Sequence, residues 1–144
     1  MQQRNIVARD FYVYSVPFGA VASLESKTAA INIEADSDFE VQKLTTTSQG
    51  ALGYDGNPEA TVTILDTGAG RNLMNTAIPL TSLFGTGELP FILPTPKLFL
   101  ARSTISLTLT NYGGDDMDEI WLNFIGRKIF YGSAPASLPP QPMG

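Results

Sequence analysis

The sequence predicts an all-β protein: a single-domain β-sandwich, jelly-roll-like, with about seven to eight strands and extended N- and C-terminal arms. Two observations predict it. Short segments alternate apolar and polar residues and are separated by Gly, Pro, Asn and Asp, whereas no long window has the spacing of an amphipathic helix. The 144 residues suit one domain. We expect residues 1–132 to form the sandwich with an N-terminal arm, and residues 133–144 to form a proline-rich tail.

The first half of the chain contains four expected strands. They cover residues 11–16, 20–33, 39–48 and 59–66. Pro17 and Gly19 are expected to end the first strand, and the alternation of the third changes phase around Lys43, which indicates a β-bulge. The fourth is the most regular, with Ala60, Val62 and Ile64 on one face. An acidic turn at 34–38 and a glycine-rich loop at 49–58 separate these strands.

The second half begins with turns and short apolar pieces over residues 67–90, in which residues 80–84 could form one helical turn. A strand at 103–111 and a last strand at 119–131 follow, joined by a hairpin turn at 112–118. Gly126 is expected to bend the last strand.

The segment 89–100 is almost entirely apolar, yet it contains Pro90, Pro94 and Pro96. Such a segment can be neither a helix nor a central strand. We expect an extended arm without a continuous ladder, whose apolar side chains cover partly this subunit and partly a neighbour. The candidate residues for an interface with another protein subunit are Phe11, Tyr12, Pro90, Phe91, Ile92, Leu93, Pro94, Pro96, Leu138, Pro139 and Pro140.

The composition excludes several kinds of protein. The chain has no Cys and no His, which removes disulfides, thiolate metal sites, Ser-His-Asp triads and histidine-bound zinc or iron. The net charge is −5 and the 9 basic residues are scattered, so no binding to nucleic acid is expected. No signal peptide and no apolar run long enough for a membrane span are found. We therefore expect a soluble protein that acts without a membrane.

Several motifs allow two interpretations. The glycine-rich segments 66–72 and 84–90 could hold phosphate, but no helical pattern follows them and tight turns are favoured. The acidic segments 34–40 and 113–119 could bind calcium, but their spacing favours solvated turns. Trp121 could line a sugar-binding groove, although core or interface packing is commoner. We predict no catalytic residue, no metal and no cofactor.

Three segments carry a resemblance to a known family: "INIEADSDFEVQKLT", residues 66–112 with the patterns "TGAGRNL" and "PFILPTP", and "LNFIGRKIF". Together, over residues 30–131, they resemble small virion structural proteins of tailed bacteriophages. The resemblance implies a capsid decoration or cement protein, not an enzyme, that binds the major capsid protein on the outer surface of the virion. It also implies a homotrimer made in the host cytoplasm. Another virion part (tail, baseplate or head fibre) and a carbohydrate-binding surface module are the alternatives.

Overall fold

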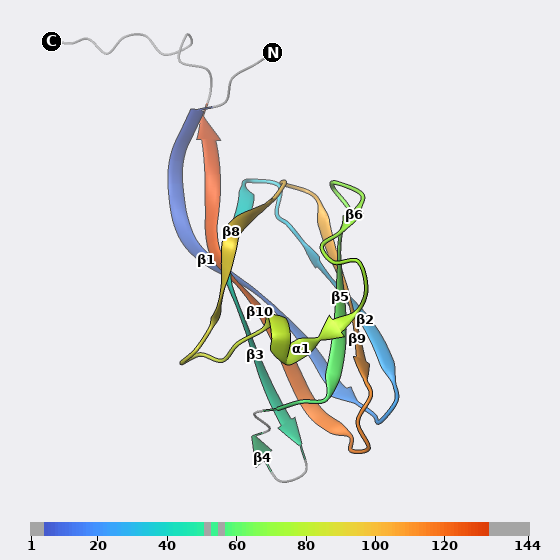
Figure 1. The fold of residues 1–144 in the computed structure, drawn as a ribbon. Coiled ribbons are helices and arrows are strands. Elements are labelled where there is room, and N and C mark those ends of the chain that lie inside the picture. The colour runs from blue at the N-terminus through green and yellow to red at the C-terminus, as the bar shows by residue number, and fades with distance from the viewer. Residues whose placement is uncertain (1–4, 51–52, 55–56, 133–144) are drawn as a thin grey trace, which may run out of the picture.

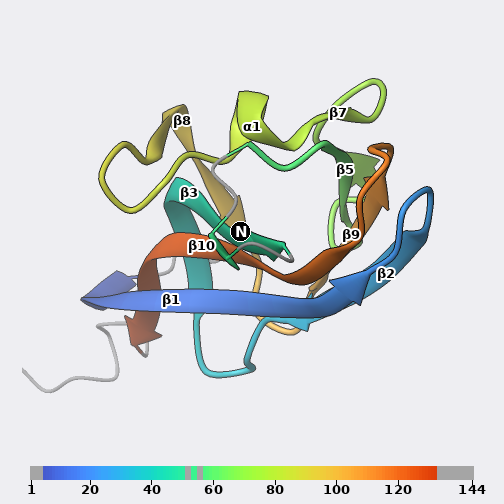
Figure 2. The same ribbon diagram turned by 90° about the horizontal axis from the view of Figure 1, so that it is seen from below.

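The computed structural model describes residues 5–50, 53–54 and 57–132, and these form a sandwich of two antiparallel sheets (Figures 1 and 2). Sheet A contains β1 (Asn5–Val21), β3 (Asp38–Gly50), β4 (Gly53–Tyr54), β8 (Phe91–Phe99) and β10 (Met117–Gly132). Sheet B contains β2 (Ser26–Asn32), β5 (Ala60–Asp66), β6 (Arg71–Asn72), β7 (Ile78–Pro79) and β9 (Thr104–Asn111). One helical turn, α1 (Leu80–Leu83), lies between the sheet edges, as expected for residues 80–84.

The strand order is that of a jelly roll. Sheet A runs β1-β10-β3, with β8 and β4 paired to different parts of β3, and sheet B runs β2-β9-β5, with β6 and β7 on β5. Among the long strands the chain alternates between the sheets, and the first strand pairs with the last while the second pairs with the next to last. This nested pairing is a hairpin folded over on itself, so the expected fold class is confirmed.

Alternating apolar residues on the facing sides of the two sheets make the core. In sheet B, the predicted face Ala60, Val62 and Ile64 is fully buried. In sheet A, Leu122 and Phe124 of β10 face it across the sandwich. About 10 Å separates two sheets packed in this way, a gap that these side chains fill. The core therefore arises from strands that are apolar on one face only.

The first strand is longer than predicted. β1 does not end at Pro17 and Gly19 but continues to Val21, with register shifts at both residues. Pro17 is tolerated because β1 is an edge strand, which has one free side and needs no ladder bond from proline there. At the other end, β1 and β10 pair from Asn5 and Gly132 onward and form a two-stranded ribbon that extends beyond the sandwich (Figure 1).

The expected strand 20–33 is correspondingly shorter, because residues 22–25 form a turn before β2 begins at Ser26. The expected loop 49–58 also differs: β3 continues to Gly50, and the short β4 pairs with its end. In contrast, the bulge expected at Lys43 is confirmed. The register of β3 with both β10 and β8 shifts between Val41 and Lys43.

The proline-rich segment forms an edge strand. β8 pairs with β3 at residues 97–99 and again at 91–92, and the ladder is interrupted between these two parts. The interruption contains Pro94 and Pro96, which have no N–H to donate. The expectation of an extended segment without a continuous ladder is therefore confirmed.

The two glycine-rich segments are turns, as favoured from the sequence. Asp66 accepts hydrogen bonds from the backbone N–H groups of Gly68 and Ala69, and Gly70 has a φ of +66° that suits glycine. In the other segment, the Thr86 N–H bonds to the Leu89 carbonyl. No helix among the described residues is long and apolar enough to cross a membrane.

Candidate interaction surface

The outer face of sheet A carries apolar side chains in rows. Directly paired residues of neighbouring strands point to the same face of a sheet. The pairing places Phe11 of β1, Arg127 of β10, Glu40 of β3 and Leu98 of β8 in one row across the sheet. Phe11 is 75% exposed, and Leu98 is exposed at the other end of the row. The row thus ends in an apolar side chain on both sides.

A second row lies next to the first. It consists of Val13, Ile125, Lys43 and Ile92, one from each of the same four strands. Val13 and Ile125 are half-buried and Ile92 is 64% exposed. We call these two rows the sheet A surface. Its eight residues come from segments that are far apart in the sequence.

An ion pair occupies the middle of the sheet A surface. The Arg127 Nε donates to Glu40 Oε1 at 2.8 Å, and both side chains are partly exposed. A surface pair of this kind adds little stability, about 0–1 kcal/mol. Arg127 and Glu40 therefore bring no unpaired charge to this surface, and Lys43 of the second row is its other charged side chain.

The outer face of sheet B is different in chemistry. Its exposed or half-buried positions are mostly hydroxyl residues: Ser26, Thr28, Thr61, Thr63, Thr104, Ser106, Thr108 and Thr110. Some of these bond to each other, as Ser26 to Thr110 at 2.6 Å and Thr28 to Thr108 at 3.1 Å. This contrast makes the sheet A surface the more apolar of the two outer faces.

The edge next to the sheet A surface is also apolar. Leu89, which is 80% exposed, and Leu100 flank β8 on either side. Pro94 and Pro96 are exposed on the strand itself and discourage the addition of a further strand, because neither can donate to a ladder. The edge therefore suits contact through side chains rather than through the backbone.

The candidate interface residues fall into three groups. Exposed on the surface are Phe11, Ile92, Pro94 and Pro96. Half-buried are Tyr12, Pro90, Phe91 and Leu93, of which Tyr12, Phe91 and Leu93 pack against this subunit's own core. Leu138, Pro139 and Pro140 lie outside the described residues. Their role in an interface stays a prediction. Leu89, Leu98 and Leu100 were not among the candidates, although they belong to the same apolar run.

On the inner side of the ribbon, Lys128 is at the centre of a polar cluster. Its side chain is buried, donates to Glu34 and lies 3.5 Å from Asp36. The ammonium also lies 4.2 Å from the centre of the Tyr12 ring, and the Tyr14 hydroxyl accepts the Glu34 backbone N–H at 3.2 Å. Sequence reasoning missed this cluster. The alternation of residues along β10 could have revealed it, because it places Lys128 on the same face as Phe124 and Gly126.

Two groups of this cluster have altered acidity. Burial of the Lys128 ammonium acts to lower its pKa, but the hydrogen bond to Glu34 and the charge of Tyr14 and Asp36 act the other way, and the pKa is raised above 10.5. Burial raises the pKa of the Tyr14 hydroxyl above 10.0. The folded state thus holds both protons more tightly than the unfolded chain.

We expect the free energy of unfolding to decrease as the pH rises above about 10. Both folded pKa values are raised, so their stabilisation is complete below the unfolded values of 10.0 and 10.5. It is lost as the pH passes through the folded values. Urea unfolding at pH 8 and pH 11 measures the change. Lys128→Met and Tyr14→Phe should each reduce the dependence on pH, and an unchanged slope in both variants would contradict this assignment.

Other candidate chemistry is sparse in the part of the chain that the structure describes. No group of three or more acidic side chains is placed to hold a metal ion there. Asp116 of the acidic hairpin instead accepts the Ser23 backbone N–H at 2.8 Å. Trp121 is partly exposed, donates to Glu119 at 2.6 Å and lines a hollow of about 150 Å³ with Thr47 and Gln49.

Comparisons with known proteins give a likeness to a solved structure. No family model matches the chain, and no curated protein matches it. Among solved structures, the chain is similar to one described as "Crystal structure of infectious bursal disease virus VP2 subviral particle", with a TM-score of 0.40 and 16% identity. The match covers 90% of this chain and 35% of that chain, so this chain spans about a third of its length. A likeness of this degree does not carry over the role of that protein.

Proposed function

We propose that the protein is a virion structural protein that decorates and cements a bacteriophage capsid, and that it has no catalytic activity. It would bind the major capsid protein on the outside of the shell through the sheet A surface and associate with itself, as a trimer. The observation that carries the proposal is the sheet A surface, in which five of the eight side chains are apolar. The resemblance of residues 30–131 to phage virion proteins is the reason for proposing a bacteriophage capsid as the partner.

The rigidity of the surface supports the proposal. β1, β10, β3 and β8 are joined by ladders beneath the two rows, so the side chains are held in position before a partner binds. Association then costs little ordering of the backbone, which leaves more of the burial energy for affinity. A face with five apolar side chains, one central ion pair and one lysine suits contact with another folded protein.

Co-sedimentation with assembled shells tests the proposal. We expect the protein to sediment with mature empty shells, and Phe11→Asp and Ile92→Asp to weaken binding by at least about tenfold, or 1.4 kcal/mol, because each places an unpaired charge in the contact. Ala30→Asp is the matched control, since Ala30 is exposed on the outer face of sheet B. Equal thermal unfolding of the three variants would show that the fold is retained.

Two results would contradict the proposal. One is failure of the wild-type protein to sediment with shells at low and moderate salt. The other is equal weakening by Ala30→Asp. Sedimentation velocity measures the trimer separately, and an electron-microscopy map of the particle distinguishes decoration from a role in a tail, baseplate or head fibre.

The carbohydrate-binding alternative has less support. It depends on Trp121 and the hollow beside it, which measures about 150 Å³. Ligand pockets usually measure about 300–1,000 Å³. The indole N–H is also already bonded to Glu119.

A further inference from the structure

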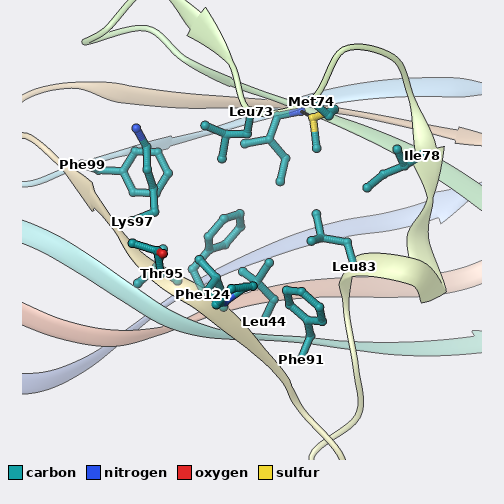
Figure 3. A pocket seen from close by; sticks show the side chains of 14 residues that line it. Leu44, Leu73, Met74, Ile78, Leu83, Phe91, Thr95, Lys97, Phe99 and Phe124 are labelled. Carbon is teal, nitrogen blue, oxygen red and sulfur yellow. Dashed lines mark hydrogen bonds between the residues drawn. The ribbon is translucent and has the colours of Figure 1, made fainter.

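An apolar cavity opens between the two sheets at the edge formed by β8. Its volume is about 410 Å³, and side chains from both sheets and from α1 line it (Figure 3). Among them are Leu44, Met74, Leu83, Phe91, Phe99 and Phe124. Thr95 and Lys97 are the polar side chains of the lining. The proposed capsid contact uses the outer face of sheet A, so this cavity belongs to a different part of the molecule.

The cavity is open to solvent at one side, so a small molecule could enter it. Water in an apolar cavity finds few hydrogen-bond partners. The volume falls within the usual range for small-molecule sites, which are mostly apolar with a few polar groups that fix the orientation of the ligand. The composition of this lining fits that description.

The polar group at this site is an ammonium. Lys97 lies on the inward face of β8, opposite Val41, and its Nζ lies 5.5 Å from the centre of the Phe99 ring (Figure 3). It forms an ion pair with Asp66 at 3.2 Å. The two partners are not equally accessible, because the Asp66 side chain is 5% exposed and that of Lys97 is 33% exposed.

The ion pair with Asp66 leaves the Lys97 ammonium able to bind a ligand. Asp66 is occupied on both oxygens: Oδ1 accepts the Gly68 and Ala69 N–H groups and Oδ2 faces Lys97. An ammonium has three N–H donors, and the pair with Asp66 uses one direction. A ligand in the cavity would therefore meet donors of Lys97 and no free carboxylate of Asp66.

We propose that the cavity binds a small aliphatic carboxylate, with its chain among the aromatic and aliphatic side chains and its carboxylate on Lys97. This binding is separate from the proposed capsid contact. The chain would fill the apolar space, and the carboxylate would make a charge-assisted hydrogen bond at the rim. The Lys97–Asp66 ion pair links β8 of sheet A to β5 of sheet B, so the carboxylate of the ligand would bind beside this link.

Calorimetric titration of the 144-residue wild-type chain with octanoate and with 1-octanol tests the class of ligand. The two probes share the chain and differ in the head group. We expect octanoate to bind at least about tenfold more tightly, because only its carboxylate gains the charged partner. Equal affinity for both probes, or no binding of either, would overturn the proposal.

Two variants locate the site. Lys97→Met with Asp66→Asn removes both charges together, so no buried charge is left alone, and it should abolish the preference for octanoate. Leu83→Trp should fill the cavity and weaken both probes by at least about tenfold. Ala30→Asp is the control and should change neither affinity. Unchanged octanoate binding in both cavity variants would place the ligand elsewhere and contradict the proposal.

Residues 133–144 are a competing occupant, because they are rich in Pro and contain Leu138. The same titrations with a chain that ends at Gly132 address this. The proposal expects equal octanoate affinity with and without the segment. If octanoate binds only after its removal, the segment fills the cavity and the proposal is wrong.

Discussion

Gly126→Ala is expected to lower the free energy of unfolding by about 4 kcal/mol or more, a large part of the roughly 5–15 kcal/mol typical of a domain. A Cβ atom at Gly126 would lie 1.9 Å from the Glu40 carbonyl oxygen and 2.8 Å from the Val41 Cα. Both are backbone atoms of β3, which cannot move away without opening the ladder between β3 and β10. Urea unfolding followed by circular dichroism measures the loss.

The matched control is Gly114→Ala in the turn before β10. A Cβ atom there would meet nothing within 4 Å, so the change should lie within about 0.5 kcal/mol of the wild type. Equal stability of Gly126→Ala and Gly114→Ala would show that β3 and β10 do not approach each other this closely at the bulge. The sequence indicated a bend at Gly126, and the structure shows the register shift between Ile125 and Gly126 that accompanies it.

Phe91→Ser combined with Leu93→Ser is expected to lower the free energy of unfolding by about 3–5 kcal/mol. Both side chains turn inward from β8 and pack against the core, where serine would leave a void and bring a hydroxyl group near apolar neighbours. Ile92 lies between them but points outward. Ile92→Ser should therefore change stability by about 0.5 kcal/mol or less.

The two variants separate folding from association. We expect Ile92→Ser to weaken sedimentation with shells while its urea midpoint stays that of the wild type. In the double variant, we expect a loss of stability to be the primary effect. A double variant as stable as the wild type that fails only in association would show that Phe91 and Leu93 cover a neighbour instead. The sequence alone predicted that the segment covers partly this subunit and partly a neighbour.

Local patterns predicted the fold well. The alternation in 59–66 and 103–111 predicted β5 and β9 within one residue at each end, because a strand with one buried face needs period-two apolar residues. The spacing of three prolines predicted an extended segment without a continuous ladder, which β8 is. The predicted end of the first strand at Pro17 and Gly19 was wrong, because only the position of a strand in its sheet decides whether it tolerates proline.

The site was less predictable. Phe11 and Ile92 were candidates because they are apolar and lie in strand-like segments. Nothing in the sequence showed that β1 and β8 present them on one face of the same sheet, in neighbouring rows. The cavity was not predicted, because its lining comes from β3, β5, β8, β10, α1 and the segment between β6 and α1.

The sequence by itself determined which residues alternate, where the chain turns, and that Cys and His chemistry is absent. These are local or compositional properties, set by the preferences of single residues and their neighbours. The tertiary structure decided which strands pair, which side of β8 faces inward, and that Lys97 meets Asp66 and Lys128 meets Glu34. Strand pairing depends on backbone hydrogen bonds, which any residue except proline can make. Which strand pairs with which is therefore decided only when the apolar faces of the two sheets pack against each other.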